Sequence, residues 1–279
     1  MKGLSCNSGL LSDFPVEEAM DILASEGYQA IDISLELSPP FRPAPKPHLT
    51  PAVDASRRAR VRAHAEQAGI AIASLNSHTN LIADDPEPRR TNFEYLRGAI
   101  QLAADLGCPV VGFGGGRKEL FGYEQVYWDR LADALRELVK IADDFGVTLA
   151  VESGSFYGNL IHSVERIQKL LSFDGLDRVR VLFDPAHYHI RGDSPVAAFD
   201  TLGDRVGHVH AKDARGHREE LVFPPLGQGE IDFSALFDRI KASGYDGFVS
   251  VEYEAFAWGF PREPRQVLAE SRAFLQELL

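Results

Sequence analysis

Four residues of types that bind metal ions each close a short apolar run of the chain. These residues are Glu152, Asp184, His210 and Glu252, and their runs cover 148–152, 179–184, 206–210 and 248–252. Runs of this length that are rich in Val, Ile and Phe are typical of buried strands. At the same ends of four parallel strands, three carboxylates and one imidazole would meet at one point. Such a set of oxygen and nitrogen donors favours a divalent-cation site.

Each of the four residues also has a simpler explanation when it is taken alone. An acid after a strand is often the N-cap of the next helix, and Asp184 before Pro185 can make a turn. His210 could be a hydrogen-bonded core histidine. Glu254 shares the face of Glu252 in an extended strand, so it is the main rival for the fourth ligand. Because four successive strands all end in ligand-type side chains, the joint pattern favours the metal site.

Strand and helix patterns alternate along the whole chain. Apolar runs predict further strands over 4–6, 30–35, 70–75 and 109–113. Helices are predicted over 16–26, 53–68, 124–145, 233–243 and 265–279, with others that end at 106, begin near 163 and follow Pro195. Eight strand-then-helix units in 279 residues predict an α/β fold, a (β/α)8 TIM barrel that forms one domain over 1–279.

The main alternative fold is an open, doubly wound sheet. That fold usually has a glycine-rich phosphate turn after its first strand, and residues 7–10 do not form one. The connections also favour the barrel, because helices lead into strands through short glycine turns while long loops, such as 38–51 with its six prolines, follow the strands. In TIM barrels these long loops build the active site, at the strand ends where the four ligand-type residues lie.

The composition sets bounds on the class of protein. The hydrophobic content of 44% and charged content of 25% are those of a soluble globular protein. A formal net charge of -12 argues against non-specific nucleic-acid binding. The two cysteines are isolated, so neither a disulfide framework nor a cysteine zinc site is expected. Without a signal-peptide pattern or an apolar stretch of membrane-spanning length, we expect a cytoplasmic protein with no membrane partner.

Several motifs of one protein family occur in the second half of the chain. They are Val-Glu-Ser at 151–153, Phe-Asp-Pro-Ala-His at 183–187, His-Val-His-Ala-Lys-Asp at 208–213, the loop 225–233, and Gly-Tyr-Asp-Gly-Phe-Val-Ser-Val-Glu at 244–252. With these motifs the chain resembles the xylose-isomerase-like TIM-barrel superfamily of sugar and sugar-phosphate isomerases and epimerases, and is nearest in motif to ketose 3-epimerases. The resemblance covers the whole chain.

The resemblance implies a role for each of the four residues. Glu152, Asp184, His210 and Glu252 would bind one divalent ion, with Mn²⁺ favoured and Mg²⁺, Co²⁺ or Zn²⁺ as alternatives. Glu152 and Glu252 would flank the reacting carbon next to a metal-bound carbonyl. One would remove its proton and the other would return a proton to the opposite face, through an enediolate. The substrate would be a small sugar, sugar phosphate or polyol.

Three further residues are expected to contact the substrate. His187 matches a substrate-binding histidine of the family, and Arg215 lies near the position of a family arginine, with Lys212 and Arg218 as alternatives. His78 ends the third strand and could line the pocket. The family's ketose 3-epimerases carry another glutamate in the loop after the first ligand, but 153–160 contains no carboxylate here. The resemblance also implies a homo-oligomer, either a dimer or a tetramer.

Weaker candidates lie in other strand-to-helix loops. The glycines of 114–116, followed by Arg117 and Lys118, could hold an anionic group of a substrate, although a flexible loop is the simpler explanation. Phe14, Trp258 and Phe260 could form an apolar wall over a sugar ring.

Other functions are possible on the same barrel. A lyase that dehydrates a keto-inositol would use the same metal and base. A metal nuclease acting at abasic sites would need extra histidines at the third and fourth strands and an Asp-x-His pair after the seventh, but strand four ends in glycines and 211–230 has no such pair. A non-catalytic sugar-binding barrel would need no pair of opposed glutamates, so their presence favours an enzyme.

Overall fold

Eight parallel strands close into a barrel in the computed structural model, which describes residues 1–35, 46–118, 123–155, 158–255 and 259–279. Each strand pairs with the next one in the sequence, and β8 pairs with β1 to close the ring. The strands are β1 (Gly3–Asn7), β2 (Ala30–Ser34), β3 (Ala71–Asn76), β4 (Val110–Gly114), β5 (Thr148–Glu152), β6 (Arg180–Phe183), β7 (Val206–Ala211) and β8 (Phe248–Val251). The predicted TIM barrel is therefore confirmed.

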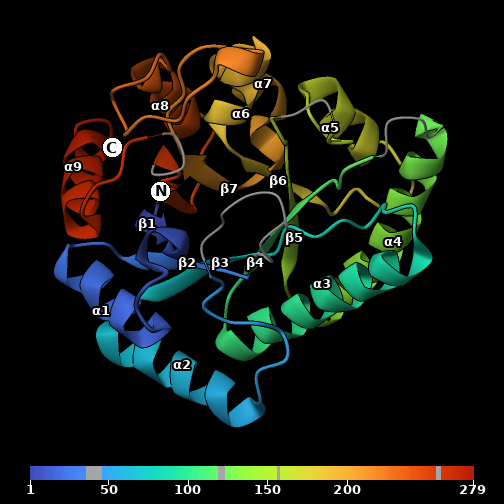
Figure 1. Cartoon of the computed structure of the whole chain (residues 1–279), viewed down its shortest axis with the longest axis horizontal. Coiled ribbons are helices and arrows are strands. Elements are labelled where there is room, and N and C mark those ends of the chain that lie inside the picture. The colour runs from blue at the N-terminus through green and yellow to red at the C-terminus, as the bar shows by residue number, and fades with distance from the viewer. Residues whose placement is uncertain (36–45, 119–122, 156–157, 256–258) are drawn as a thin grey trace.

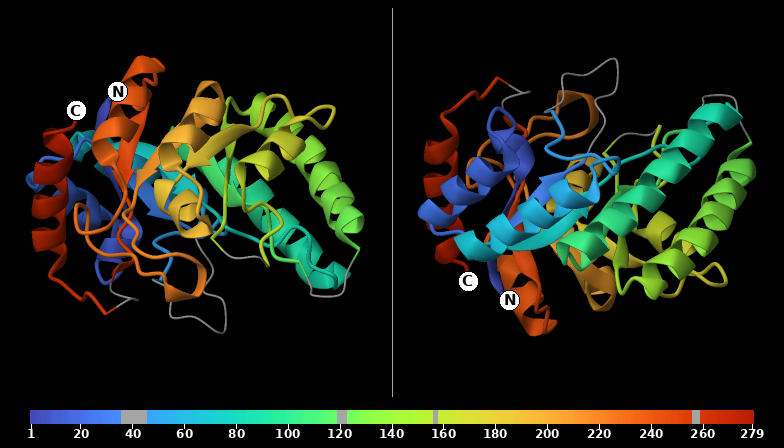
Figure 2. Two further views of the ribbon diagram at one scale, coloured as in Figure 1. Left: turned by 90° about the horizontal axis from the view of Figure 1, so that it is seen from above. Right: turned by 90° about the horizontal axis from the view of Figure 1, so that it is seen from below.

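Helices follow every strand and surround the barrel (Figure 1). The α-helices are α1 (Val16–Ser25), α2 (Ala55–Ala68), α3 (Pro86–Leu106), α4 (Glu124–Asp144), α5 (Val164–Leu171), α6 (Pro185–Arg191), α7 (Pro195–Leu202), α8 (Phe233–Ala242) and α9 (Pro264–Gln276). Short 3-10 turns are η1 (Ser8–Leu11), η2 (Gly203–Arg205) and η3 (Arg218–Glu220). The views from above and below show the ring of helices from its two edges (Figure 2). Within the ranges that the structure describes, none of the helices combines the length and the hydropathy that a membrane span requires.

Sequence and structure differ mainly after the sixth strand. The strand expected over 179–184 is β6, which stops at Phe183, and a helix that the sequence analysis did not predict, α6, begins at once. Asp184 is the N-cap of α6 and Pro185 is its first residue, a position that proline favours because its fixed φ suits a helix. The strand expected over 248–252 likewise stops at Val251. Of the expected loop 38–51, residues 36–45 lie outside the described part of the chain.

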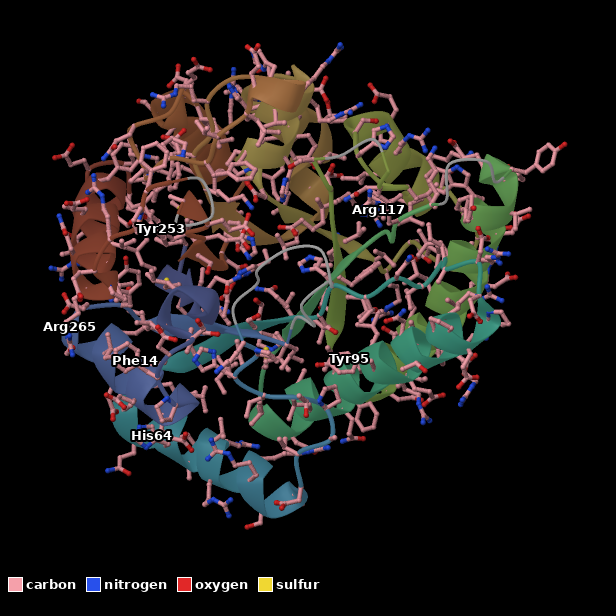
Figure 3. The ribbon with its side chains drawn as sticks, in the orientation of Figure 1. Phe14, His64, Tyr95, Arg117, Tyr253 and Arg265 are labelled. Atoms are coloured by element: carbon pink, nitrogen blue, oxygen red, sulfur yellow. The ribbon has the colours of Figure 1, made fainter. Side chains whose placement is uncertain are left out.

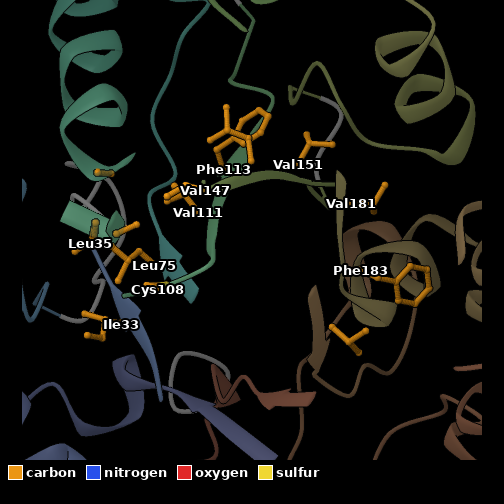
Figure 4. Packing of buried hydrophobic residues seen from close by; sticks show 14 of the residues in the cluster. Ile33, Leu35, Leu75, Cys108, Val111, Phe113, Val147, Val151, Val181 and Phe183 are labelled. Carbon is orange, nitrogen blue, oxygen red and sulfur yellow. The ribbon is translucent and has the colours of Figure 1, made fainter. Parts of the chain in front are cut away.

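Apolar side chains pack on both sides of the barrel wall. The larger cluster fills the space between the strands and the helices, and Figure 4 shows some of its members, including Val151, Val181 and Phe183. A smaller cluster of Val110, Ala150 and Leu182 is separate from it.

A glycine in β4 permits close packing beside this smaller cluster. A Cβ atom on Gly112 would lie 2.7 Å from Leu182 Cδ1 and 2.7 Å from Asn76 Oδ1. A side chain at this position would therefore push the neighbouring strands apart.

The helix ends follow the expected glycine turns. Gly69 and Gly107 cap α2 and α3 with φ of 67° and 72°, the left-handed conformation that favours glycine. Such tight returns bring each helix directly back to the next strand. The long connections consequently gather at the carboxyl ends of the strands, where the candidate site lies.

Candidate metal centre and active site

The four ligand-type residues come together at the carboxyl ends of β5 to β8. Glu152 is the last residue of β5 and His210 is the fifth of six in β7, while Asp184 and Glu252 directly follow β6 and β8. One ligand atom from each lies within 4.8 Å of the others. The side chains of Asp184 and His210 are fully buried, and those of Glu152 and Glu252 are 9% and 11% exposed. The geometry is that of a preformed cation site, and metal binding itself stays a prediction.

Asp184 serves the helix and the site with different oxygens. Its Oδ1 accepts a hydrogen bond of 2.8 Å from the backbone N–H of Ala186 and so caps α6. Its Oδ2 lies 2.9 Å from Lys212 Nζ and 3.2 Å from His187 Nε2. The N-cap explanation and the ligand explanation of this aspartate are thus compatible.

The two glutamates have similar surroundings beside His210. Glu152 Oε1 lies 3.2 Å from His210 Nδ1, and Glu252 Oε2 lies 3.4 Å from the same nitrogen. The second oxygen of each glutamate contacts a polar side chain from another strand end. Glu152 Oε2 lies 2.8 Å from His78 Nε2, and Glu252 Oε1 accepts a hydrogen bond of 3.2 Å from Asn7 Nδ2. Each glutamate therefore has one oxygen toward the cluster and one held by a neighbour.

Glu254, the rival for the fourth ligand, is set apart from the cluster. The group of ligand atoms that lie together contains Glu252 and not Glu254. Glu254 Oε2 instead accepts a hydrogen bond of 3.2 Å from Lys212, and its side chain is 25% exposed. The chain leaves β8 at Val251, so the alternation of an extended strand no longer applies at 254.

A buried polar network lies behind His210. Asp32 Oδ2 accepts a hydrogen bond of 2.6 Å from His208 Nε2 and lies 3.4 Å from His210 Nε2, while Asp32 Oδ1 accepts one of 2.7 Å from Ser5. A carboxylate behind a metal-binding histidine fixes the orientation and tautomer of the ring. Sequence reasoning missed Asp32, although a charged residue inside the apolar run of β2 must be paired when it is buried.

Three of the buried ligand atoms have no ordinary hydrogen-bond partner among the described residues, as expected at a site for a divalent cation. Within the described part of the chain, Glu152 Oε1, Asp184 Oδ2 and His210 Nδ1 are buried without a hydrogen bond of normal geometry. Buried polar atoms are nearly always satisfied by a hydrogen bond, water or an ion. Three carboxylates and one imidazole match the donors that Mn²⁺, Mg²⁺ or Zn²⁺ accept. The residues therefore fit a divalent ion.

Burial and charge shift the pKa values of this cluster in opposite directions. Burial raises the pKa of Glu152, but the charge of His78 and the close contacts with His210 and His78 outweigh burial and hold that pKa below its usual range. The pKa of Glu252 is lowered well below its usual range, because the charges of Lys212 and His210 outweigh the effect of burial. For Asp184 burial wins over the charges of Lys212 and His187, so its pKa is raised.

The three residues expected to contact the substrate lie in different places. His187, in α6, has Nε2 3.2 Å from Asp184 Oδ2 and its Nδ1 bonded to Ser155 Oγ. His78 follows β3 and contacts Glu152, so both histidines border the cluster. Arg215 pairs its backbone with Val222 and has an exposed side chain, and the structure does not bring it to the four residues.

Lys212 is the basic residue that reaches the cluster. It follows β7 directly, is 3% exposed, and donates hydrogen bonds of 2.7 Å to Glu252 Oε2 and 3.2 Å to Glu254 Oε2. The sequence analysis named it only as an alternative to Arg215. Its position two residues beyond His210 indicates the same face of the chain, because side chains alternate in a strand.

The weaker candidates are engaged elsewhere or lie outside the described residues. Lys118 Nζ pairs with Glu124 Oε2 at 2.8 Å, and the backbone of Arg117, which is labelled in Figure 3, bridges to Asn159. Phe14 packs against the main core (Figure 3). Phe260 packs beside Tyr253. Trp258 is outside the part of the chain that the structure describes.

A loop with two glycines is fixed next to the site by one buried carboxylate. Asp213 Oδ2 accepts hydrogen bonds from the backbone N–H groups of Gly227 and Gly229, at 2.9 and 2.8 Å. A Cβ atom on Gly229 would lie 2.0 Å from Asp213 Oδ1, so only glycine fits there. This contact explains why the motif residues at 213 and at 227–229 occur together.

Comparisons with known proteins agree with this architecture. The family model described as "Xylose isomerase-like TIM barrel" matches residues 20–278. A fructoselysine 3-epimerase of Shigella flexneri is 25% identical over 271 residues, which are 94% of each chain. An inosose dehydratase of Lacticaseibacillus casei is 31% identical over 142 residues, which are 46% of this chain and 47% of that protein.

Solved structures share the fold. The crystal structure of a D-tagatose 3-epimerase-like protein matches with a TM-score of 0.81 and 21% identity, over 99% of this chain and 96% of the other. Since the family model covers more than nine-tenths of the chain, this protein belongs to the xylose isomerase-like TIM barrel family.

Proposed function

We propose that this chain is a divalent-metal-dependent enzyme that isomerises or epimerises a sugar or polyol by proton transfer. The observation that carries the proposal is the convergence of Glu152, Asp184, His210 and Glu252 within 4.8 Å at the carboxyl ends of four strands. The named relative that spans almost the whole chain is a sugar epimerase, which supports the same reaction class. We propose that residues 1–279 act as one domain.

The four residues would hold one divalent ion. When bound, the ion would polarise the substrate carbonyl and stabilise the negative charge that develops on its oxygen. The resemblance to the family's epimerases favours Mn²⁺, and Mg²⁺, Co²⁺ and Zn²⁺ suit the same donors. Asp32 would keep the His210 ring in place through its 3.4 Å contact to Nε2.

Glu152 and Glu252 would carry the proton. They stand at the carboxyl ends of β5 and β8, two strands that are not neighbours in the barrel, so a substrate between them would present one face to each. One carboxylate would take the proton from the carbon next to the carbonyl, and the other would return a proton to the opposite face. The oxygens available for this step are Glu152 Oε2 and Glu252 Oε1, which His78 and Asn7 orient.

The substrate would be a small molecule with neighbouring oxygen atoms. His187 would bind a substrate oxygen, because it borders the cluster and is held by Ser155. Arg215 would have to reach the substrate from an exposed loop, so we assign the basic contact to Lys212 in its place. We also propose that the chain forms a homo-oligomer, either a dimer or a tetramer, on the basis of the family resemblance alone.

A second candidate function is an inosose dehydratase type of lyase. The 31% identity to an inosose dehydratase over about half the chain favours it. Such a lyase would remove the proton in the same way, but the opposite carboxylate would protonate a leaving hydroxyl in place of the carbon. The two reactions therefore need the same residues and differ in product.

A substrate panel tests the proposal and separates the two reactions. Ketoses, ketose phosphates and inososes are incubated with the protein and Mn²⁺, and the products are identified by NMR. An epimer or isomer of one substrate supports the first function, and loss of water from an inosose supports the second. Absence of any metal-dependent conversion in a broad panel would count against both.

A further inference from the structure

Lys212 places a buried ammonium group among the carboxylates of the site. Its side chain is only 3% exposed, and Nζ lies 2.9 Å from Asp184 Oδ2, 2.7 Å from Glu252 Oε2 and 3.2 Å from Glu254 Oε2. His187 Nε2 lies 3.5 Å away, and the Phe223 ring centre 4.9 Å away. Burying a lysine ammonium costs free energy unless the ammonium is paired. The surrounding carboxylates therefore hold Nζ at this position.

Two of the oxygens that Lys212 contacts belong to the proposed metal ligands and face the other ligand atoms. Asp184 Oδ2 is the oxygen that does not cap α6, since the cap uses Oδ1. Glu252 Oε2 is the oxygen that faces His210 Nδ1, whereas Oε1 accepts from Asn7. A divalent ion at the four residues would need these same two oxygens.

The site carries more negative charge than one divalent ion neutralises. Four carboxylates, those of Glu152, Asp184, Glu252 and Glu254, contact Lys212 or the ligand cluster. They carry four negative charges when ionised, and a divalent ion would neutralise two of them. Lys212 neutralises one more. Its positive charge therefore stabilises the carboxylates both when the ion is bound and when it is not.

We propose that Lys212 competes with the divalent ion for Asp184 Oδ2 and Glu252 Oε2 and thereby sets the metal affinity of the site. Binding of the ion shifts the ammonium toward Glu254, the carboxylate outside the cluster that it already contacts, while the ring of Phe223 gives the ammonium a cation–π contact. The proposal rests on the proposed function, because it takes the four residues as ligands of the metal. Lys212 is a positioning residue here, which acts on the metal through two of its ligands.

The sign of the change in metal affinity tests the proposal. Lys212→Met removes the charge and keeps an unbranched stem of similar length. Because a unit positive charge close to a divalent ion opposes its binding, we expect Lys212→Met to bind Mn²⁺ at least about tenfold more tightly. The dissociation constant is measured by competition with a chelator, starting from the protein as purified. The rise in melting temperature on addition of Mn²⁺ should increase in parallel, because tighter binding stabilises the folded state more.

Two further variants make the result specific. Lys212→Arg keeps the charge and should leave the dissociation constant within about threefold of the wild type, by the same electrostatic argument. Lys118→Met removes a lysine that is paired with Glu124 outside the cluster and should leave the dissociation constant for Mn²⁺ unchanged. If Lys212→Met does not fold, as judged by circular dichroism, Lys212→Gln takes its place.

The outcomes separate this proposal from the proposed function. A dissociation constant that is unchanged or higher in Lys212→Met would show that the lysine only holds the carboxylates in place, and it would overturn the competition. In that case the wild type would still bind the ion and the proposed function would stand. If neither the wild type nor any variant binds Mn²⁺, Zn²⁺, Co²⁺ or Mg²⁺, both proposals fail.

Discussion

His78 Nε2 lies 2.8 Å from Glu152 Oε2, while the other oxygen of this glutamate, Oε1, lies 3.2 Å from His210 Nδ1. The carboxylate is thus held between two histidines from different strand ends. Glu252 is held in a comparable way, with Oε1 bonded to Asn7 and Oε2 near His210. In both glutamates one oxygen is directed to the ligand cluster and the other is held by a polar side chain from another strand end.

His78 should therefore affect catalysis more than metal binding. Residues that orient a catalytic or ligating group usually contribute about 10- to 100-fold. We expect His78→Ala to lower kcat by about that factor, because the Glu152 oxygen that we propose moves the proton loses its neighbour. Steady-state kinetics with the substrate found in the panel measures the change. His64→Ala, in a surface pair with Asp21, is the matched control and should behave as the wild type. A kcat for His78→Ala equal to that of the control would contradict the assignment.

The two glutamates should be needed for turnover. Loss of general acid–base catalysis alone lowers a rate by about 10²- to 10⁴-fold. We expect Glu152→Gln and Glu252→Gln each to lose at least this much in kcat, because an amide cannot accept the proton. Glu165→Gln, an exposed residue of α5, makes the same chemical change outside the site and serves as control. Near-normal turnover by both variants would refute the two-glutamate mechanism.

Asp32 should control metal affinity from behind His210. Asp32→Asn weakens the contact to His210 Nε2 and the hydrogen bond to His208, so the imidazole loses its orientation. We expect a 10- to 100-fold higher dissociation constant for Mn²⁺, the cost typical of such outer partners. Asp21→Asn removes a carboxylate from an exposed Asp–His pair and is the matched control. The idea fails if Asp32→Asn folds and binds Mn²⁺ as the wild type does.

The fold was predictable because its physical signals are local and repeated. Eight apolar runs, each followed by a helical stretch, leave few arrangements besides a closed barrel. The four ligand-type residues were found because each ends a run. The helix α6 was missed because Asp184-Pro185 is compatible with either a turn or a helix start.

The partners of the four residues could not be predicted in the same way. Asp32 lies 176 residues from His208 in the sequence, and Asn7 lies 245 residues from Glu252, and only closure of the barrel brings them together. The sequence did not decide whether Lys212 or Arg215 is the basic residue that contacts the substrate, because a loop sequence does not say which basic side chain turns inward. In the structure Lys212 is buried and Arg215 is exposed, which supports Lys212 as the basic contact that we propose.

Glu124 should make the stability of the fold depend on pH. It accepts hydrogen bonds from Arg166 and Lys118 at the start of α4, and these bonds lower its pKa from 4.5 to about 2. A depressed carboxyl pKa stabilises the folded state fully above the unfolded value, and this contribution is lost as the pH falls through the folded value. Because the side chain is 40% exposed, solvent screens the pairs and we expect less than about 1 kcal/mol.

Urea unfolding of the wild type and Glu124→Gln checks this pH dependence. The free energy of unfolding should be lower in the variant at pH 7, and the difference should shrink as the pH falls from 4.5 toward 2. A difference that stays constant over this range would show that the glutamate acts by packing or helix propensity and not by its charge.

Solvent deuterium should enter the product at the inverted carbon. If Glu152 and Glu252 work on opposite faces, the proton that one of them removes is not the proton that the other returns. Product formed in heavy water should then carry about one deuterium at that carbon, and substrate recovered at partial conversion shows how often the first carboxylate returns its own proton. Incorporation should stop when a chelator removes the metal and resume when Mn²⁺ is added back, because the ion lowers the cost of the charge formed on the carbonyl oxygen. An isomerase that works by hydride shift would instead move the hydrogen between neighbouring carbons and leave the product free of deuterium. Full turnover without deuterium in the product would therefore reject proton transfer by the two glutamates, while the metal site, which the dissociation constants measure separately, would remain.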